Sequence, residues 1–350
     1  MSLRTAIFST TSLVLLAGSA SADVTANDIW SDWKSYLSGF GYTVDADEQM
    51  SGNALHITNL TMTVPMPEDG GSFAVTLDKI DFVENTDGTV NLLFPEAMPI
   101  VFAGQGPAGE LVKGALNYTM QNMDMRASGD PSKVTYAYTA DQMGVALTEL
   151  TVDGDTLPMG ALKVQFLASA IEGQSIMEPG ALRKVVQDMT FGETTYQLDL
   201  QDPDSADAMS LNGKITSMSF SGATSFPETV NPDNMAETLA NGFAVNGSFS
   251  YTGSATDFAF SDGSDTMGGS SATQSGEVAV RMDKNALEYG GSSKGMTLNL
   301  TGAQIPFPVV LNLGEVAFKL LMPVAKSDSS SDAAFSLTLA DFATSEDLWS

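Results

Sequence analysis

The chain of 350 residues contains no cysteine and one histidine, and this absence excludes several kinds of chemistry. Without cysteine there are no disulfides, thiol nucleophiles or zinc–thiolate sites, so packing and backbone pairing must hold the fold together. A lone histidine cannot complete a catalytic triad or a histidine metal site, and we interpret His56 as structural. The sequence also lacks a Gly-x-Ser-x-Gly elbow and a Walker loop. We therefore expect no catalytic residue, no cofactor and no metal.

Basic residues are scarce. Lysine and arginine number 15 against 43 aspartates and glutamates, which gives a formal net charge of −28. Such a charge repels the phosphates of nucleic acids and disfavours anionic membrane surfaces. The simplest interpretation is that the acidic residues keep the protein soluble. The composition thus predicts that nucleic acid is not a partner.

Residues 1–22 have the pattern of a secretory signal peptide. One cation, Arg4, precedes an apolar stretch that is too short and too rich in serine and threonine to span a membrane. Small residues at Ala20 and Ala22 fit a signal-peptidase site with cleavage between Ala22 and Asp23. We expect an exported, periplasmic protein, and an association with the outer membrane is left open.

Residues 304–324 form the longest apolar stretch near the C-terminus. Three prolines, Glu315 and Lys319 interrupt it, so a transmembrane helix is not expected there or elsewhere in the mature chain. Read with the period of two that is typical of strands, the apolar residues change sides at Gly314. A bulge containing glycine is the usual cause of such a change.

The same change of side recurs in five further segments, which cover residues 55–62, 75–82, 145–152, 215–220 and 337–342. A straight strand would keep its apolar residues on one parity throughout. Bulged or sharply bent strands return these residues to one side after the bend, where they would line a shared apolar groove. The residues we expect to line a ligand groove are Leu60, Met62, Ile80, Phe82, Leu150, Val152, Val316 and Phe318.

Turn signals predict a β-meander. Asp-Gly, Asn-Gly and Ser-Gly pairs punctuate the apolar stretches, and these residues tolerate the positive φ of tight hairpins. The predicted fold is mainly β. It is a long curved antiparallel sheet, or an open barrel or groove, with bulged strands.

Two amphipathic segments interrupt the strands. Residues 27–41 predict a helix capped by Asn27, with its tryptophans on the apolar face, packed over the end of the sheet. Residues 231–242 predict a short helix capped by Asn231. Residues 344–350 have the pattern of a helix start, and the sequence could be a fragment of a longer protein.

Residues 261–276 contain almost no apolar side chains and predict a flexible Gly/Ser loop. This loop would separate a part over residues 23–260, made of the N-terminal helix and strands, from a β-rich part over residues 277–350. The two parts could share one continuous sheet. The loop faintly resembles a calcium loop, but it lacks the terminal glutamate of an EF-hand.

Residues 287–324 and 335–349, together with the N-terminal segment, resemble an uncharacterised family of alphaproteobacterial envelope proteins known as a domain of unknown function. The proline-rich segment, the "LLMP" run and the closing "LW" carry this resemblance. The resemblance implies an envelope location and no catalytic residues. The bent strands also resemble those of AsmA-like proteins, whose repeated strands curl into an apolar groove.

Three functions remain open at this point. The first is a non-catalytic periplasmic β protein that holds an acyl chain or lipid, or docks another envelope protein, through an apolar face of the sheet. The second is an outer-membrane β-barrel, which would need alternating spans and aromatic girdles. The third is a hydrolase that uses carboxylates. The parity changes and the many Met, Phe and Leu residues favour the first.

Overall fold

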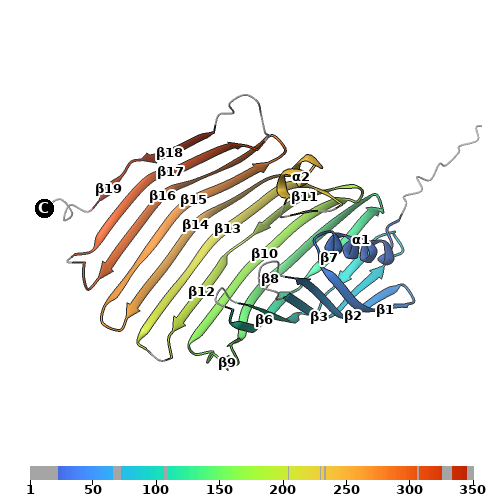
Figure 1. Ribbon diagram of the computed structural model, residues 1–350, viewed down its shortest axis with the longest axis horizontal. Coiled ribbons are helices and arrows are strands. Elements are labelled where there is room, and N and C mark those ends of the chain that lie inside the picture. Colours follow the sequence, from blue (N-terminus) through green and yellow to red (C-terminus); the bar gives the residue numbers. More distant parts are fainter. Residues whose placement is uncertain are drawn as a thin grey trace, which may run out of the picture.

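A computed structural model describes residues 23–65, 72–105, 109–203, 205–228, 230–231, 234–305, 307–324 and 333–344. They form one antiparallel sheet of 19 strands and two short helices, which confirms the predicted mainly β fold (Figure 1). The predicted signal peptide and its cleavage site at Ala22 lie outside the described residues. Of the predicted helix start over residues 344–350, Thr344 belongs to a short strand and the other residues lie outside the described ones.

One helix begins the described chain, strands of very different length follow it, and a second helix lies between β13 and β14. The first half comprises α1 (Ala26–Gly39), β1 (Thr43–Ser51), β2 (Ala54–Pro65), β3 (Ser72–Glu84), β4 (Val90–Leu93), β5 (Ala97–Gln105), β6 (Leu111–Gln121), β7 (Asp124–Asp130), β8 (Lys133–Val152), β9 (Asp155–Thr156) and β10 (Leu162–Glu178). The second half comprises β11 (Leu182–Phe191), β12 (Thr194–Gln201), β13 (Asp207–Pro227), α2 (Met235–Ala240), β14 (Ala244–Asp262), β15 (Thr266–Met282), β16 (Ala286–Gly302), β17 (Val309–Pro323), β18 (Ala334–Ala340) and β19 (Ala343–Thr344).

Neighbours along the chain pair as antiparallel hairpins over most of the sheet. From β13 to β18 each strand pairs with the next one, so this part is a plain meander. Earlier strands interleave, because β8 pairs with β6, β7 and β10, and β13 pairs with both β11 and β12. The long β8, β10 and β13 tie the interleaved half to the meander.

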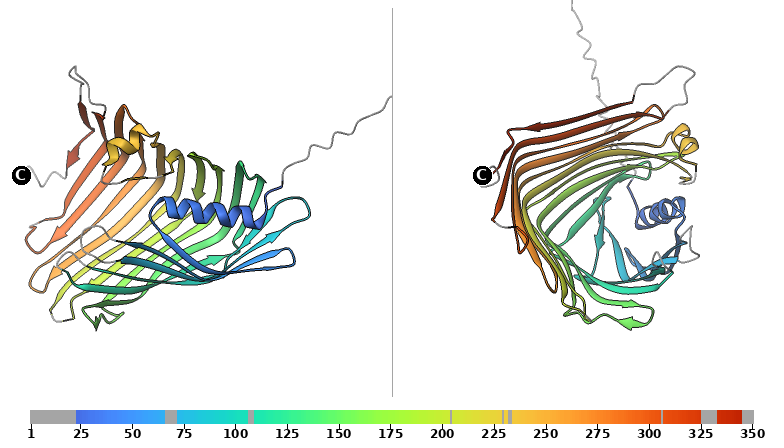
Figure 2. Two further views of the ribbon diagram at one scale, coloured as in Figure 1. Left: turned by 45° about the vertical axis from the view of Figure 1, so that its right-hand side comes forward. Right: turned by 60° about the vertical axis from the view of Figure 1, so that its left-hand side comes forward.

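The sheet curls, and α1 lies inside the curl (Figure 2). We call the side that carries α1 the concave face and the other side the convex face. Residues directly opposite one another in a ladder share a face. One row of such residues therefore follows the concave face from below α1 to the last long strand: Tyr136, Ser175, Gln187, Gly222, Gly247, Val280, Tyr289, Leu320 and Phe335.

The strands bend along a single line that crosses the sheet. On this line lie residues with positive φ, and from β14 to β18 they occupy every second strand. Asn122 lies opposite Asp141, and its side-chain amide donates to the Asp141 carboxylate at 2.6 Å. The residues with positive φ at these bends are Asn59, Asn122, Ala170, Gly253, Gly295 and Asp341.

Two of these residues, Asn59 and Asp341, lie in segments where a change of side was predicted, whereas the bends at Asn122, Ala170, Gly253 and Gly295 were not predicted. Leu55, Ile57 and Leu60 are all buried, although Asn59 stands between the last two and shifts the parity. The mechanism differs from a one-residue insertion at most bends. Thr252 pairs with Ser275, and two residues later the same register holds, so both strands bend together. Register shifts of the bulge type occur between Asp45 and Asp47 and between Ala115 and Leu116.

The predicted loop over residues 261–276 is wrong. β14 continues to Asp262 and β15 begins at Thr266, so a tight turn replaces the loop and the sheet is continuous through it. The small polar residues of this segment are strand residues. Gly269 and Gly276 lie under the rings of Phe258 and Tyr251, where larger side chains would not fit. The glycines of this segment therefore make room for aromatic rings of a neighbouring strand and do not mark a loop.

The helices form where expected, with different caps and a different location. Thr25 caps α1 in a capping box with Asp28, because its hydroxyl accepts from the Asp28 N–H, so Asn27 is not the cap. α1 packs inside the curl and not over the end of the sheet (Figure 2). α2 begins after Asn234 in place of Asn231. Neither helix in the described ranges is long and apolar enough to cross a membrane.

The convex face is polar. Hydroxyl groups pair across β13 and β14, with oxygen–oxygen distances of 2.7 Å for both Ser217–Thr252 and Ser219–Ser250. Further along, Arg281 of β15 forms an ion pair with Glu288 of β16 at 3.4 Å. The alternation of side chains therefore places most of the large apolar residues on the concave face and most of the charged residues on the convex face.

The bend at Gly253 provides a test of the fold. Gly253 has a φ of +61°, so we expect Gly253→Val to lower the free energy of unfolding by roughly 2 kcal/mol, because a β-branched residue is strained there. Asparagine occupies two of the other bends and tolerates this conformation, so Gly253→Asn is the control and should lose less. Urea unfolding followed by circular dichroism measures both. Equal losses for the two variants would contradict a role for the left-handed backbone.

Candidate functional site

α1 covers the first part of the concave face. Its side chains Ile29 and Trp30 are completely or almost completely buried against Ile57, Phe82 and neighbouring residues. Trp33 packs edge-on against Phe82, with ring centroids 5.4 Å apart. The helix and the strands β2, β3, β4, β7 and β8 thus form the main core.

Three contacts between side chains fix α1 to the sheet, in addition to the Ala26 N–H, which donates to the Glu84 carboxylate at 2.9 Å. Asp32 accepts two hydrogen bonds from the Arg183 guanidinium, at 2.6 and 2.7 Å, and both side chains are about nine-tenths buried. The indole N–H of Trp33 donates to the hydroxyl of Tyr136 at 3.1 Å. Lys34 forms an ion pair with Glu48 at 2.7 Å, in an exposed position. The bidentate pair is the strongest of the three because it is both charge-assisted and shielded from water.

A cavity of about 370 Å³ lies between α1 and the sheet. Its lining is mostly apolar and aromatic, with Ser175 and Gln187 as the polar side chains apart from the tyrosines. Three of the residues expected to line a groove belong to it: Leu60, Met62 and Ile80. Burial also raises the pKa of the Tyr136 hydroxyl, another lining group, to about 12.

Beyond α1 the concave face is uncovered and remains apolar. A cross-strand row over the meander consists of Phe220, Phe249, Val278, Gly291, Phe318 and Leu337. Exposure is greatest on β18, where Phe335 is 68% and Leu337 is 58% exposed. Soluble proteins rarely expose a contiguous apolar surface of more than a few hundred Å² without using it to bind something. We call the uncovered concave surface of β13–β18 the open groove.

Aromatic rings lie flat across glycines on this face. Tyr251 of β14 pairs directly with Gly276 of β15, and a Cβ atom on that glycine would overlap the ring. Flat rings make the floor smooth and shallow, and the absent side chains make room for them. The same arrangement holds for the pairs Tyr138–Gly173, Tyr196–Gly213 and Phe102–Gly114.

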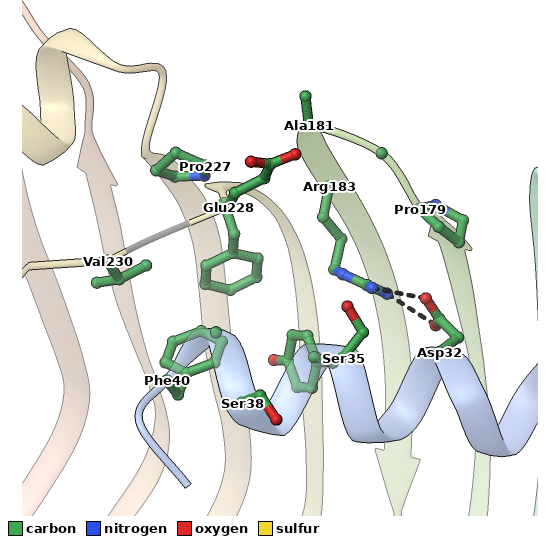
Figure 3. A pocket seen from close by; sticks show the side chains of 14 residues that line it. Asp32, Ser35, Ser38, Phe40, Pro179, Ala181, Arg183, Pro227, Glu228 and Val230 are labelled. Atoms are coloured by element: carbon green, nitrogen blue, oxygen red, sulfur yellow. Dashed lines mark hydrogen bonds and ion pairs between the residues drawn. The ribbon is translucent and has the colours of Figure 1, made fainter.

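A second cavity, of about 600 Å³, opens beside the C-terminal half of α1 (Figure 3). We call it the mouth. Asp32, Ser35 and Ser38 line it from α1, and Phe40 lines it from just after the helix. Arg183, Pro227 and Glu228 border it from the ends of β11 and β13 (Figure 3). Its lining is therefore mixed, with charges and hydroxyls beside aromatic rings.

Charge on the concave face is concentrated at the mouth. Ladder pairing places Arg183 opposite Phe226, and among the described strands it is the one lysine or arginine on the concave side. Its guanidinium also lies 5.2 Å from the ring centre of Tyr36. Burial, the largest influence, raises the pKa of the Tyr36 hydroxyl, and the charge of Arg183 partly opposes this.

The structure brings four of the eight expected groove residues together. Leu60, Met62, Ile80 and Phe82 lie on β2 and β3 below α1, and Phe82 is completely buried there, within the core. The other four residues form two pairs, which lie apart from this set and from one another. Leu150 and Val152 face β6 near the end of β8, while Val316 and Phe318 belong to the open groove on β17.

Two parts of the candidate site escaped the sequence reasoning. The open groove over β13–β16 carries Phe249, Val280 and Tyr289, which follow ordinary strand alternation, and the period of two in these segments could have shown them. The Asp32–Arg183 pair joins residues 151 positions apart. No local signal in the sequence marks such a pair.

Polar chemistry elsewhere is limited. The described residues include no group of three or more His, Asp or Glu side chains placed to hold a metal ion. His56 contacts Asp81 at 2.7 Å on the convex side, as a structural histidine would. Partial burial acts to raise the pKa of Asp81, but hydrogen bonds from Lys79 and His56 outweigh it and lower the pKa overall.

Comparisons with family models, with curated proteins and with solved structures give no match for this chain. The resemblance to the alphaproteobacterial envelope family stays a prediction from the sequence. The function is therefore inferred from the geometry of the concave face.

The buried hydroxyl of Tyr136 predicts a dependence of stability on pH. Its pKa is raised from 10 to about 12 in the folded state, so the folded protein holds this proton more tightly than the unfolded chain does. Stability is then fully present below pH 10 and falls as the pH rises toward 12, by roughly 2 kcal/mol. Urea unfolding at about pH 9 and about pH 11 measures the first part of this loss, about 1.4 kcal/mol, because pH 11 is one unit above the pKa of the unfolded chain. Tyr136→Phe should show a smaller loss over the same range, and an identical loss would contradict the assignment.

The pairing of Tyr251 with Gly276 predicts a coupled effect of two substitutions. Gly276→Val should displace the Tyr251 ring and lower the free energy of unfolding by about 1–3 kcal/mol, as overpacking does. In a Tyr251→Ala background the same change should cost less, because the ring is absent. A double-mutant cycle by urea unfolding gives the coupling energy, and strictly additive losses would refute the contact.

Proposed function

We propose that this protein is a non-catalytic, exported envelope protein that holds the acyl chain of a lipid against the concave face of its sheet. The observation that carries the proposal is the open groove, where a continuous apolar surface with flat aromatic rings extends beyond the reach of α1. The signal-peptide pattern predicted for residues 1–22 supports the proposed location.

An acyl chain suits this surface better than a polar ligand does. A chain of methylene groups needs no hydrogen-bond partners, and the row from Phe220 to Leu337 offers none from its side chains. Sugars and peptides would need donors and acceptors along the whole path. The hydroxyls that the face does carry are paired in part with each other, as Tyr196 is with Thr256 at 2.5 Å.

Burying an acyl chain in the open groove would release enough free energy for measurable binding. Burying one methylene group is worth about 0.8 kcal/mol, so ten of them would give about 8 kcal/mol before the costs of association. A free energy of that size corresponds to a dissociation constant near 1 μM. The loss of translational and conformational freedom on association makes the actual binding weaker. We expect affinities from about 1 to 100 μM for single-chain lipids.

The test uses two adjacent residues on opposite faces of β15. Val280 lies in the open groove and Ala279 on the convex face. Val280→Asn places an amide where an acyl chain would lie, so it should weaken binding of a fluorescent fatty-acid ester by about fivefold, whereas Ala279→Asn should leave binding unchanged. Fluorescence titration of the protein without residues 1–22 measures the three affinities.

Lipid analysis of protein purified natively from the envelope gives a second, independent readout. A co-purifying lipid in the wild-type protein, reduced in Val280→Asn, would agree with the proposal. No binding of the ester and no co-purified lipid would overturn it. In that case, docking of another envelope protein on the open groove becomes the better account of the same apolar surface.

A further inference from the structure

We propose that the mouth binds the ammonium group of an amphiphile whose acyl chain lies in the open groove. This inference rests on the proposed function and adds to it the chemical class of the headgroup. The mouth and the groove meet at Phe226, which borders the mouth and begins the concave row of β13. Phe226 also packs against Phe243 at the start of β14, with ring centroids 5.7 Å apart. A chain anchored at the mouth thus continues onto apolar surface.

The electrostatics of the mouth favour a cation. Asp32 and Arg183 neutralise each other through two short hydrogen bonds, which leaves the exposed carboxylate of Glu228 as the remaining charge. The C-terminal end of α1, at Gly39, also faces this cavity and has no basic residue in its last turn. The helix dipole places partial negative charge at that end. Both contributions attract an ammonium group and repel a carboxylate or sulfate.

Aromatic rings supply the second element of ammonium recognition. Tyr36, Phe40 and Phe226 line the mouth, with ring centroids 5.1 to 5.9 Å apart in edge-to-face arrangements. A quaternary ammonium group binds to the faces of such rings through their quadrupoles. The net charge of −28 acts in the same direction over a longer range, because it concentrates cationic amphiphiles near the protein.

An anionic head is the competing possibility, since Arg183 is the concave cation. Its guanidinium is already occupied by Asp32 and lies close to the thioether of Met177 at 3.0 Å. An anion would have to displace a buried carboxylate to pair with it, and breaking a buried pair is costly. The geometry therefore favours the ammonium.

The experiment compares three amphiphiles that share a dodecyl chain and differ in the head: trimethylammonium, maltoside and sulfate. Each displaces the fluorescent fatty-acid ester from the protein, below its micelle concentration and at about 0.15 M salt, where long-range charge effects are screened. We expect the trimethylammonium compound to bind about tenfold more tightly than the sulfate, with the maltoside between them.

Two variants with matched controls locate the headgroup. Glu228→Gln should weaken trimethylammonium binding by about threefold and leave maltoside binding unchanged. Glu149→Gln makes the same change of charge at an exposed position on β8, away from the mouth, and should alter neither. Phe226→Leu should also weaken trimethylammonium selectively, by about threefold, whereas Phe260→Leu, at the other end of the open groove, should change trimethylammonium and maltoside binding by the same factor.

The outcomes separate this inference from the proposed function. If the three heads bind equally, or if Glu228→Gln and Glu149→Gln behave alike, the mouth is not an ammonium site, while the open groove keeps its acyl chain. If the sulfate binds most tightly, the inference is overturned in favour of Arg183. If neither the ester nor any dodecyl compound binds, the proposed function fails, and the inference fails with it.

Discussion

The structure depends on one constraint: every strand that bends must bend at the same level as its neighbours. A parity change in a single strand would send its apolar residues to the wrong face and break the ladder. Here the residues from Asn122 to Asp341 form a line across the sheet, so adjacent strands change parity together and their register survives. The sheet can therefore curl strongly and still keep its apolar residues on the inside.

That curl creates an apolar concave face that is larger than one helix can cover. α1 shields the strands β2, β3, β4, β7 and β8 and is fixed there by the Asp32–Arg183 pair and the Trp33–Tyr136 contact. The meander from β13 to β18 has no such cover among the described residues, and the exposure of its apolar side chains reaches 68% at Phe335. One fold thus contains a closed core and an open groove made by the same strand pattern.

The sequence predicted the fold class and some of the bends, because local patterns of apolar residues indicate both. The parity change around Asn59 and the turn pairs need no knowledge of partners. What failed was the segment over residues 261–276, where composition suggested a loop. Gly276 is there because Tyr251 lies over it, and that neighbour comes from another strand. The mouth was missed for the same reason, since Arg183 and Asp32 meet through the curl of the sheet.

Most charged residues lie on the convex face, so the open groove has charged groups at one border only. The lysines and arginines of the described strands lie on the convex face except for Arg183, and their acidic neighbours, such as Glu288, lie there with them. A ligand on the concave face therefore meets its first charged groups at the mouth, beside Asp32, Arg183 and Glu228. An amphiphile has one end that avoids charge and one that needs it. A surface that is apolar along its length and charged at one border fits that asymmetry, which a purely hydrophobic groove would not recognise.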